Sequence, residues 1–193
     1  VVSFVYQTPS VATGALKYLT NDWQISGNYR WMSGSPYTVG YSISGVGSAN
    51  ITGSDQGARI VLNGDAGSGS SSDPYKQLNT TVFSPPQPGS IGIESPRYFV
   101  YGPPVNNIDL SLSKSFPLGG RRRVEVRLDA FNALNTVQFS SVNSTANFNS
   151  MSDPTIINLP YNSSGTLVNP NGFGTVSGQR SPRQLQFMTR FSF

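Results

Sequence analysis

Several residue types that usually carry chemistry are missing or scarce in this sequence of 193 residues. It contains no cysteine and no histidine, and only 11% of its residues are charged. The lack of cysteine excludes a disulfide framework and a thiolate metal site, and the lack of histidine removes the commonest general base and metal ligand. No segment approaches the roughly 18 consecutive apolar residues of a membrane-spanning helix. A role in a membrane would therefore require strands.

Aromatic and neutral polar residues are abundant instead. The chain has 11 Phe, 9 Tyr and 2 Trp, and most of its polar residues are Ser, Thr, Asn and Gln. A soluble domain usually has about a quarter charged residues, and a disordered chain has few aromatics. The mixture suits strands with one apolar face and one neutral polar face, and it predicts an all-β fold.

Alternation of apolar and polar residues with a period of two predicts five strands. In the clearest one, Trp23, Tyr29 and Trp31 share one face. Because Trp and Tyr favour the two interfaces of a membrane, we expect these three residues to belong to an aromatic girdle. The predicted strands lie near residues 1–6, 23–33, 107–116, 122–132 and 184–193.

The charged residues of these strands lie opposite the apolar ones. Segment 122–132 also fits helical spacing, but its charges fall on every second residue after a Pro-Leu-Gly-Gly turn, which favours a strand. Alternation directs such residues into the lumen of a barrel. Polar packing there is a simpler interpretation of the carboxylates than a catalytic pair. The predicted lumen-facing residues are Arg30, Asp109, Glu125, Arg127, Asp129 and Arg190.

The net charge of +4 does not indicate a nucleic-acid partner, because the basic residues do not gather on one face. The one cluster, Arg121–Arg123, follows the Gly-Gly turn and is interpreted as a solvated flank at a membrane surface. We expect no enzyme activity, no cofactor and no metal site.

Connections between the predicted strands alternate between short and long. Residues 7–22 and 117–121 form short ones, whereas 34–106 and 140–183 are long. An outer-membrane barrel distributes short periplasmic turns and long extracellular loops in this way. We therefore predict an antiparallel meander of about five transmembrane strands with two long extracellular loops, the C-terminal part of a large outer-membrane β-barrel. The last strand would descend to the periplasm.

The first long loop contains a further alternating stretch, in which Val39 and Ile43 share a face with two tyrosines. We expect it to continue the second strand above the membrane as a ribbon. Tyrosines of the loops are candidate ligand contacts, although they would also serve to pack the loops together. They are Tyr37, Tyr41, Tyr98 and Tyr101, with Tyr75 and Tyr161.

Several stretches resemble the C-terminal barrel region of TonB-dependent outer-membrane receptors. They are NIDLSLSKSF at 107–116, VRLDAFNALN at 126–135, RQLQF at 183–187 with the strand that follows, and WQISG at 23–27 before SGSPY at 33–37. More narrowly, they resemble Oar-like receptors with a carboxypeptidase-regulatory-like N-terminal domain. The resemblance implies a many-stranded barrel that is plugged by an N-terminal domain and driven by TonB to import a scarce nutrient.

The last strand also resembles the β-signal that the barrel-assembly machinery reads. An aromatic final residue anchors a strand at the membrane interface, and an exposed edge can pair with a template strand. A strand that merely faces lipid would show the same alternation without a special need for the final residue. The predicted assembly signal is Leu185, Phe187, Phe191 and Phe193.

Two functions are compatible with these patterns. The first is part of a TonB-dependent receptor for nutrient uptake in the bacterial outer membrane, with membrane lipid, the rest of the barrel and its plug, the TonB system and the assembly machinery as partners. The alternative is a structural subunit of an extracellular or cell-surface polymer, a filament or tube of many copies, because an open sheet leaves two unpaired edges. The N-terminus shows no secretory signal and already resembles a strand, so the chain looks like a fragment or a processed product.

Overall fold

The structure, a computed structural model, describes residues 1–46, 51–52, 57–69 and 73–193. The remaining parts of the predicted loop 34–106 lie outside the described residues. The chain divides into two compact units. The sheet unit comprises Val1–Met32, Val105–Gln138 and Arg180–Phe193, and the loop unit comprises Ser33–Pro104 and Phe139–Gln179.

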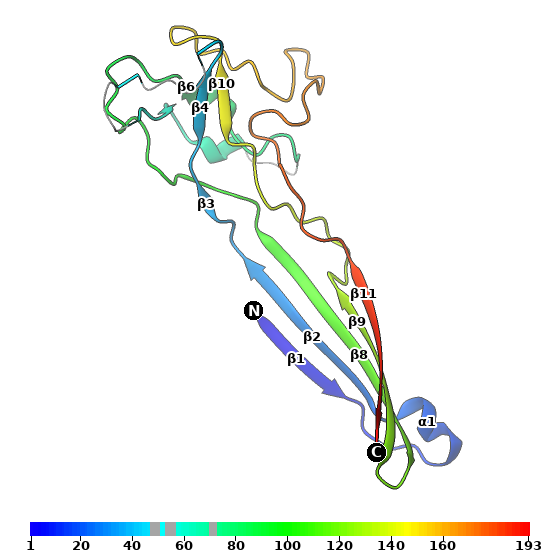
Figure 1. The fold of residues 1–193 in the computed structure, drawn as a ribbon. Helices are drawn as coiled ribbons and strands as arrows, with labels where there is room; N and C mark the ends of the chain where they lie inside the picture. Colours follow the sequence, from blue (N-terminus) through cyan, green and yellow to red (C-terminus); the bar gives the residue numbers. More distant parts are fainter. Residues whose placement is uncertain (47–50, 53–56, 70–72) are drawn as a thin grey trace. The chain divides into compact units, whose positions relative to one another are not determined.

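Five long strands form the sheet unit, and they lie side by side in Figure 1. Every neighbouring pair is antiparallel, which confirms the predicted all-β antiparallel fold class. Segment 122–131 is a strand and not a helix. In spatial order the strands are β1 (Val2–Gln7), β2 (Trp23–Met32), β8 (Val105–Gly119), β9 (Arg122–Phe131) and β11 (Gln184–Ser192).

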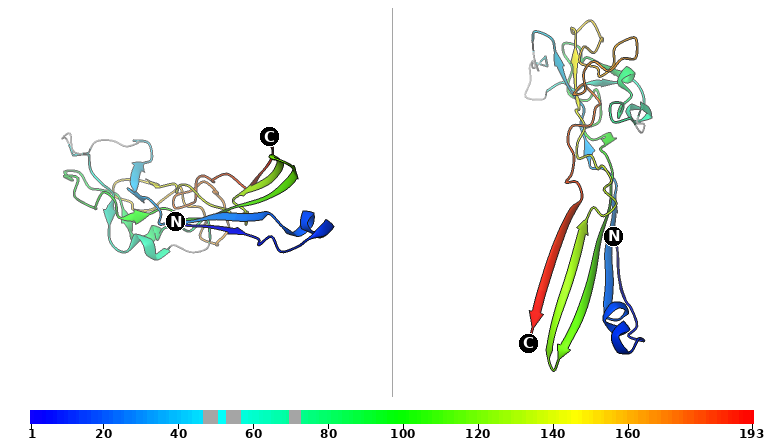
Figure 2. Two further views of the ribbon diagram at one scale, coloured as in Figure 1. Left: turned by 90° about the horizontal axis from the view of Figure 1, so that it is seen from below. Right: turned by 90° about the vertical axis from the view of Figure 1, so that its right-hand side faces the viewer.

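The register of the sheet aligns the alternating residues of all five strands into rows. One row is entirely apolar and consists of Tyr6, Ile25, Leu112, Leu128 and Phe187. The next row contains Val5 and then only polar residues, Ser26, Ser111, Asp129 and Gln186. Since neighbouring rows point to opposite faces, the curved sheet seen in Figure 2 has one apolar face and one polar face.

Short connections join the strands at one end of the sheet. Between β1 and β2 the chain forms a 3-10 turn, η1 (Gly14–Leu16), and a single helical turn, α1 (Lys17–Thr20). Between β8 and β9, Gly119 and Gly120 have φ values of 96° and 62°, which glycine adopts without the steric cost of a Cβ atom. No helix in the described residues has the length and apolar character needed to cross a membrane.

In the described residues of the loop unit the strands are short and joined in pairs. β3 (Pro36–Tyr37) pairs with β7 (Val100–Tyr101), and β5 (Val61–Leu62) with β6 (Phe83–Ser84). β4 (Gly40–Ile43) pairs in parallel with β10 (Thr145–Phe148), which joins the two long connections to each other. Two 3-10 turns, η2 (Ala66–Gly69) and η3 (Thr80–Val82), complete the unit.

The prediction that a ribbon continues β2 is wrong. β2 ends at Met32, and the alternating stretch forms two separate strands, β3 and β4, with different partners. Val39, which lies between them, and Ile43 are buried in the loop unit. Their alternation therefore reflects burial in a core within the loops and not an extension of the membrane strand.

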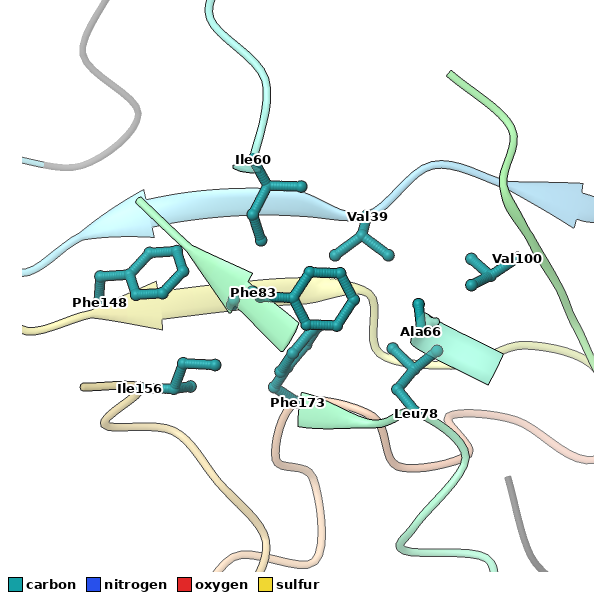
Figure 3. Packing of buried hydrophobic residues seen from close by; sticks show 10 residues of the cluster. Val39, Ile60, Ala66, Leu78, Phe83, Val100, Phe148, Ile156 and Phe173 are labelled. Atoms are coloured by element: carbon teal, nitrogen blue, oxygen red, sulfur yellow. The ribbon is translucent and has the colours of Figure 1, made fainter. Parts of the chain in front are cut away.

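A single hydrophobic core holds the loop unit together (Figure 3). Both long connections contribute to it, and the rings of Phe83 and Phe173 meet edge to face with centroids 5.4 Å apart. The two connections thus form one folded body and not two independent loops. The buried core residues are Val39, Ile60, Ala66, Leu78, Phe83, Val100, Ala146, Phe148, Ile156 and Phe173.

Candidate functional site

The polar face of the sheet gathers the charged residues that were predicted to face a lumen. Arg127 Nε lies 2.8 Å from Asp129 Oδ1 and also donates to Ser111 Oγ at 2.9 Å. Glu125 lies directly opposite Arg190 in the register of β9 and β11. Cross-strand and same-strand pairs of opposite charge thus balance the carboxylates on this face.

Asp109 and Arg30 lie toward the other end of the same face, around a hollow of about 310 Å³. Asp109 Oδ1 accepts hydrogen bonds from Asn107 Nδ2 and from the backbone N–H of Asn132, both at 2.9 Å. The hollow is also lined by Gln138 and Arg180. With two arginines against one aspartate, its wall carries a net positive charge and several amide donors, a combination that suits a polar or anionic solute.

Amide groups hold the Asp109 carboxylate, and hydroxyl and guanidinium groups hold that of Asp129. Among the residues that the structure describes, no three His, Cys, Asp or Glu side chains come close enough together to hold a metal ion. The arrangement can bind and orient polar groups along the sheet.

The predicted aromatic girdle lies on the apolar face. Trp23 stands at the start of β2, where its indole Nε1 donates to the carbonyl oxygen of Leu19 at 2.7 Å. Tyr29 and Trp31, near the other end of the strand, are exposed. One end of this strand thus presents the exposed rings of Tyr29 and Trp31, whereas Trp23 at the other end is half-buried beside Lys114.

The predicted assembly-signal residues form the exposed edge of the same face. Leu185, Phe187 and Phe191 extend along β11, and the rings of Phe191 and Phe193 lie 6.0 Å apart. All four side chains are exposed. β11 pairs only with β9 in the described sheet, so its other edge has free backbone hydrogen-bonding groups.

Sequence reasoning missed one residue on the apolar face, Lys114. Its position in β8 lies opposite Trp23 of β2 and Val126 of β9, yet its side chain is only 5% exposed. The signal that identifies it is a lysine that breaks an apolar alternation between Leu112 and Phe116.

The structure separates the predicted loop tyrosines into two groups. Tyr37 and Tyr41 pack against the core of the loop unit, where burial raises the pKa of Tyr37 to about 12. Burial also raises the pKa of Tyr41, with a smaller contribution from the charge of Glu94. Tyr98 and Tyr101 are exposed. Packing therefore accounts for the first two, and only the second two present their rings to solvent.

Tyr75 and Tyr161 line a pocket of about 230 Å³ in the loop unit. Their rings meet edge to face with centroids 6.4 Å apart, and the Tyr161 hydroxyl donates to Asp73 Oδ2 at 2.8 Å. Hydrogen bonds from the Tyr75 backbone N–H and from this hydroxyl hold the pKa of Asp73 below its usual value. The two aromatic rings offer a surface on which a small ring can stack. The Lys76 ammonium, 5.0 Å from the centroid of the Tyr161 ring, can donate hydrogen bonds to it.

Comparison with protein families yields a match that spans almost the whole chain. The family model described as "Outer membrane beta barrel domain" matches residues 1–186. Searches of curated proteins and of solved structures yield no match. The family match covers both units, including the long connections that form the loop unit.

Proposed function

Because the chain belongs to the outer membrane beta barrel domain family, we propose that it is part of a TonB-dependent receptor that imports a nutrient across the bacterial outer membrane. In this proposal the sheet unit supplies barrel strands, with its apolar face to lipid and its polar face to the lumen. The loop unit receives the solute at the cell surface.

The observation that carries the proposal is the shared core of the two long connections. A pore that only admits small solutes needs no recognition surface, whereas a receptor needs a surface that is ordered before the solute arrives, because ordering a loop on binding weakens affinity. Phe148 and Phe173, which belong to the second long connection, are fully buried against residues of the first. The tyrosine pocket is built on this fixed core, since Leu78 belongs to both.

Import also needs a polar path, and the polar face of the sheet is consistent with one. The hollow around Asp109 and Arg30 offers amide and guanidinium donors to a solute. The coupling to TonB rests on the resemblance of residues 107–116 and 126–135 to that receptor class.

Nutrient depletion measured by mass spectrometry tests the proposal, because it follows every compound of the medium at once and so identifies the solute itself. Cells that carry the intact receptor are compared with cells that lack it, and each is grown with and without TonB. We expect at least one compound of the medium to disappear only when both are present. Tyr161→Ala should slow its uptake, whereas Ile93→Ala, a change at an exposed residue of the loop unit outside the pocket, should not. If no compound depends on either protein, the receptor proposal is wrong.

The last strand is proposed to carry the assembly signal. Removal of Phe193 from the intact protein should reduce insertion into the outer membrane, measured by the heat-modifiable gel mobility of the folded barrel. Phe131→Ala, which changes an exposed aromatic residue at the end of β9, serves as the control. Unchanged insertion without Phe193 would contradict the signal.

The polymer remains a second candidate because β1 and β11 each pair with one neighbour in the described sheet. Addition of strands from other copies would satisfy both edges. The mass of the native particle separates the two functions: a polymer built from units of 20.7 kDa favours the structural role. A single longer polypeptide that contains this sequence favours the receptor.

A further inference from the structure

A lysine on the apolar face of a membrane sheet needs an explanation. Lys114 shares its face with Leu110, Leu112 and Phe116, because these residues alternate along β8. A Lys on the lipid-facing side of a barrel costs about 2–4 kcal/mol at the middle of the bilayer and about 0–1 kcal/mol near an interface. The Lys114 side chain is nevertheless only 5% exposed to solvent.

The connection between β1 and β2 provides the shield. Lys114 Nζ donates to the carbonyl oxygen of Asn21 at 2.6 Å and to that of Leu19 at 3.4 Å. The ammonium also lies 4.7 Å from the ring centroid of Trp23 and 5.3 Å from that of Phe116. Contacts between a cation and these two rings add to the hydrogen bonds. Lys114 therefore fastens the connection to the sheet through groups that belong to the apolar face.

The connection is closed upon itself as well. The side chain of Asn21, only 6% exposed, donates to the carbonyl oxygen of Ala12 at 2.9 Å and accepts from the Ala12 backbone N–H at 3.2 Å. Trp23 Nε1 shares the Leu19 carbonyl with Lys114. These bonds fix residues 12–21 as a compact lobe at the edge of the apolar face.

The free side of this lobe is apolar. Leu16 is 64% exposed and Leu19 is 73% exposed, and Val11, which precedes the lobe in the chain, is also exposed. A cation accompanies them, since Lys17 Nζ lies 5.0 Å from the ring of Tyr18. The Arg121–Arg123 turn lies at the same end of the sheet (Figure 1). Exposed leucines with neighbouring cations are typical of segments that lie in a membrane interface.

We propose that residues 11–21 form a membrane foot, which inserts Leu16 and Leu19 into the acyl boundary of the nearer leaflet. The surface it binds is a phospholipid leaflet with anionic headgroups, because the foot continues the apolar face. Its cation Lys17, together with Arg121 and Arg122 at the β8–β9 turn, matches headgroup phosphates. Lys114 is the latch that holds the foot against the sheet. This role rests on the proposed function, because the foot reaches lipid only if the barrel itself is in the membrane.

The lack of cysteine in these 193 residues makes the foot directly measurable, because a single introduced cysteine is then the only thiol among them for a spin label. We would label Leu19→Cys, with Phe187→Cys as the lipid-facing reference and Ile93→Cys, an exposed residue of the loop unit, as the water-facing reference. The protein is reconstituted into vesicles of phosphatidylglycerol or phosphatidylcholine. The accessibility of each label to oxygen and to a water-soluble nickel chelate reports its depth.

The Leu19 label should behave like the Phe187 label, with high accessibility to oxygen and low accessibility to nickel. It should lie deeper in phosphatidylglycerol than in phosphatidylcholine vesicles. Lys114→Met, which keeps the length and apolar stem of the side chain but removes its donors, should raise the nickel accessibility of the Leu19 label and leave that of the Phe187 label unchanged.

Each contrary result would overturn a different part of the proposal. If the Leu19 label is as accessible to nickel as the Ile93 label while the Phe187 label remains in lipid, the foot is wrong and the barrel stands. Equal depth in both lipids overturns the role of headgroup charge, and an unchanged Leu19 label in Lys114→Met overturns the latch. If the Phe187 label is also in water, the membrane barrel itself fails.

Discussion

The two units use the same apolar residues in opposite ways. Phe187 in the sheet unit is 68% exposed, whereas Phe173 in the loop unit is fully buried. In the sheet, alternate residues align into an apolar face of the kind that an outer-membrane barrel turns toward lipid. In the loop unit, apolar residues from distant segments converge on one another and exclude water. One chain thus contains two hydrophobic surfaces, one that needs lipid and one that is complete without it.

The largest expected effect is in the loop core. Phe173→Ala should destabilise the loop unit by about 3–5 kcal/mol, because it removes a buried aromatic ring and leaves a cavity. Hydrogen exchange of the loop amides in the reconstituted protein measures this loss. Phe187→Ala, the matched change in the sheet, should leave exchange in the loop unit unchanged. Equal acceleration in both variants would mean that the two units do not have separate stabilities.

The next effect tests the two faces of the sheet. Phe187→Arg places a charge in the apolar row and should reduce the stability of the membrane-inserted barrel by about 2–4 kcal/mol if the row crosses the middle of the bilayer. Gln186→Arg places the same charge on the polar face one residue earlier and should cost much less. Urea titration of the protein in liposomes compares them. A larger cost at Gln186 would reverse the assignment of the faces.

A smaller effect is expected from alkaline pH, and only in the loop unit. The pKa of Tyr37 is raised by burial from 10.0 to about 12, so the folded state favours the neutral phenol. The resulting stability is complete below pH 10 and is lost as the pH rises toward 12. Hydrogen exchange of the loop amides across this range should accelerate less steeply in Tyr37→Phe than in the unchanged protein, after correction for intrinsic exchange. Identical pH profiles would exclude Tyr37 as the cause.

The smallest effect concerns the ion pair on the polar face. Arg127→Ala should cost less than about 1 kcal/mol, because the Arg127 side chain is 43% exposed and water screens its contact with Asp129. Urea titration in liposomes again provides the measurement, with Arg127→Lys to separate charge from geometry. A loss as large as that of Phe187→Arg would show that water screens the ion pair much less than the exposure of Arg127 indicates.

The sheet was the predictable part of the fold. Successive side chains of a strand point to opposite faces, so a strand between lipid and a polar lumen alternates apolar and polar residues. The alternation from Trp23 to Trp31 is long enough to identify such a strand. The unequal lengths of the connections then indicated a meander. Each strand of the sheet pairs with the strand that comes next along the chain within the sheet unit. The antiparallel order can therefore be predicted once the five strands are identified.

The loop unit was not predictable in this way. Its strands have only two to four residues, too few for a period, and its central pair joins Gly40–Ile43 to Thr145–Phe148 across most of the chain. The same limit applies to the candidate sites. Loop tyrosines were recognised as a group, but only tertiary contacts separate buried Tyr37 from pocket-lining Tyr161. Lys114 was overlooked because its hydrogen-bond partners lie in another connection.

The parallel pairing of β4 with β10 has a consequence for how such surfaces change over time. The two long connections are separated in the chain by the β8–β9 hairpin, yet neither can keep its half of the core without the other. Exchange of one connection at a time would therefore disrupt the shared core. We expect the pair to be inherited, lost or replaced as a single block, while the strands between them stay constant.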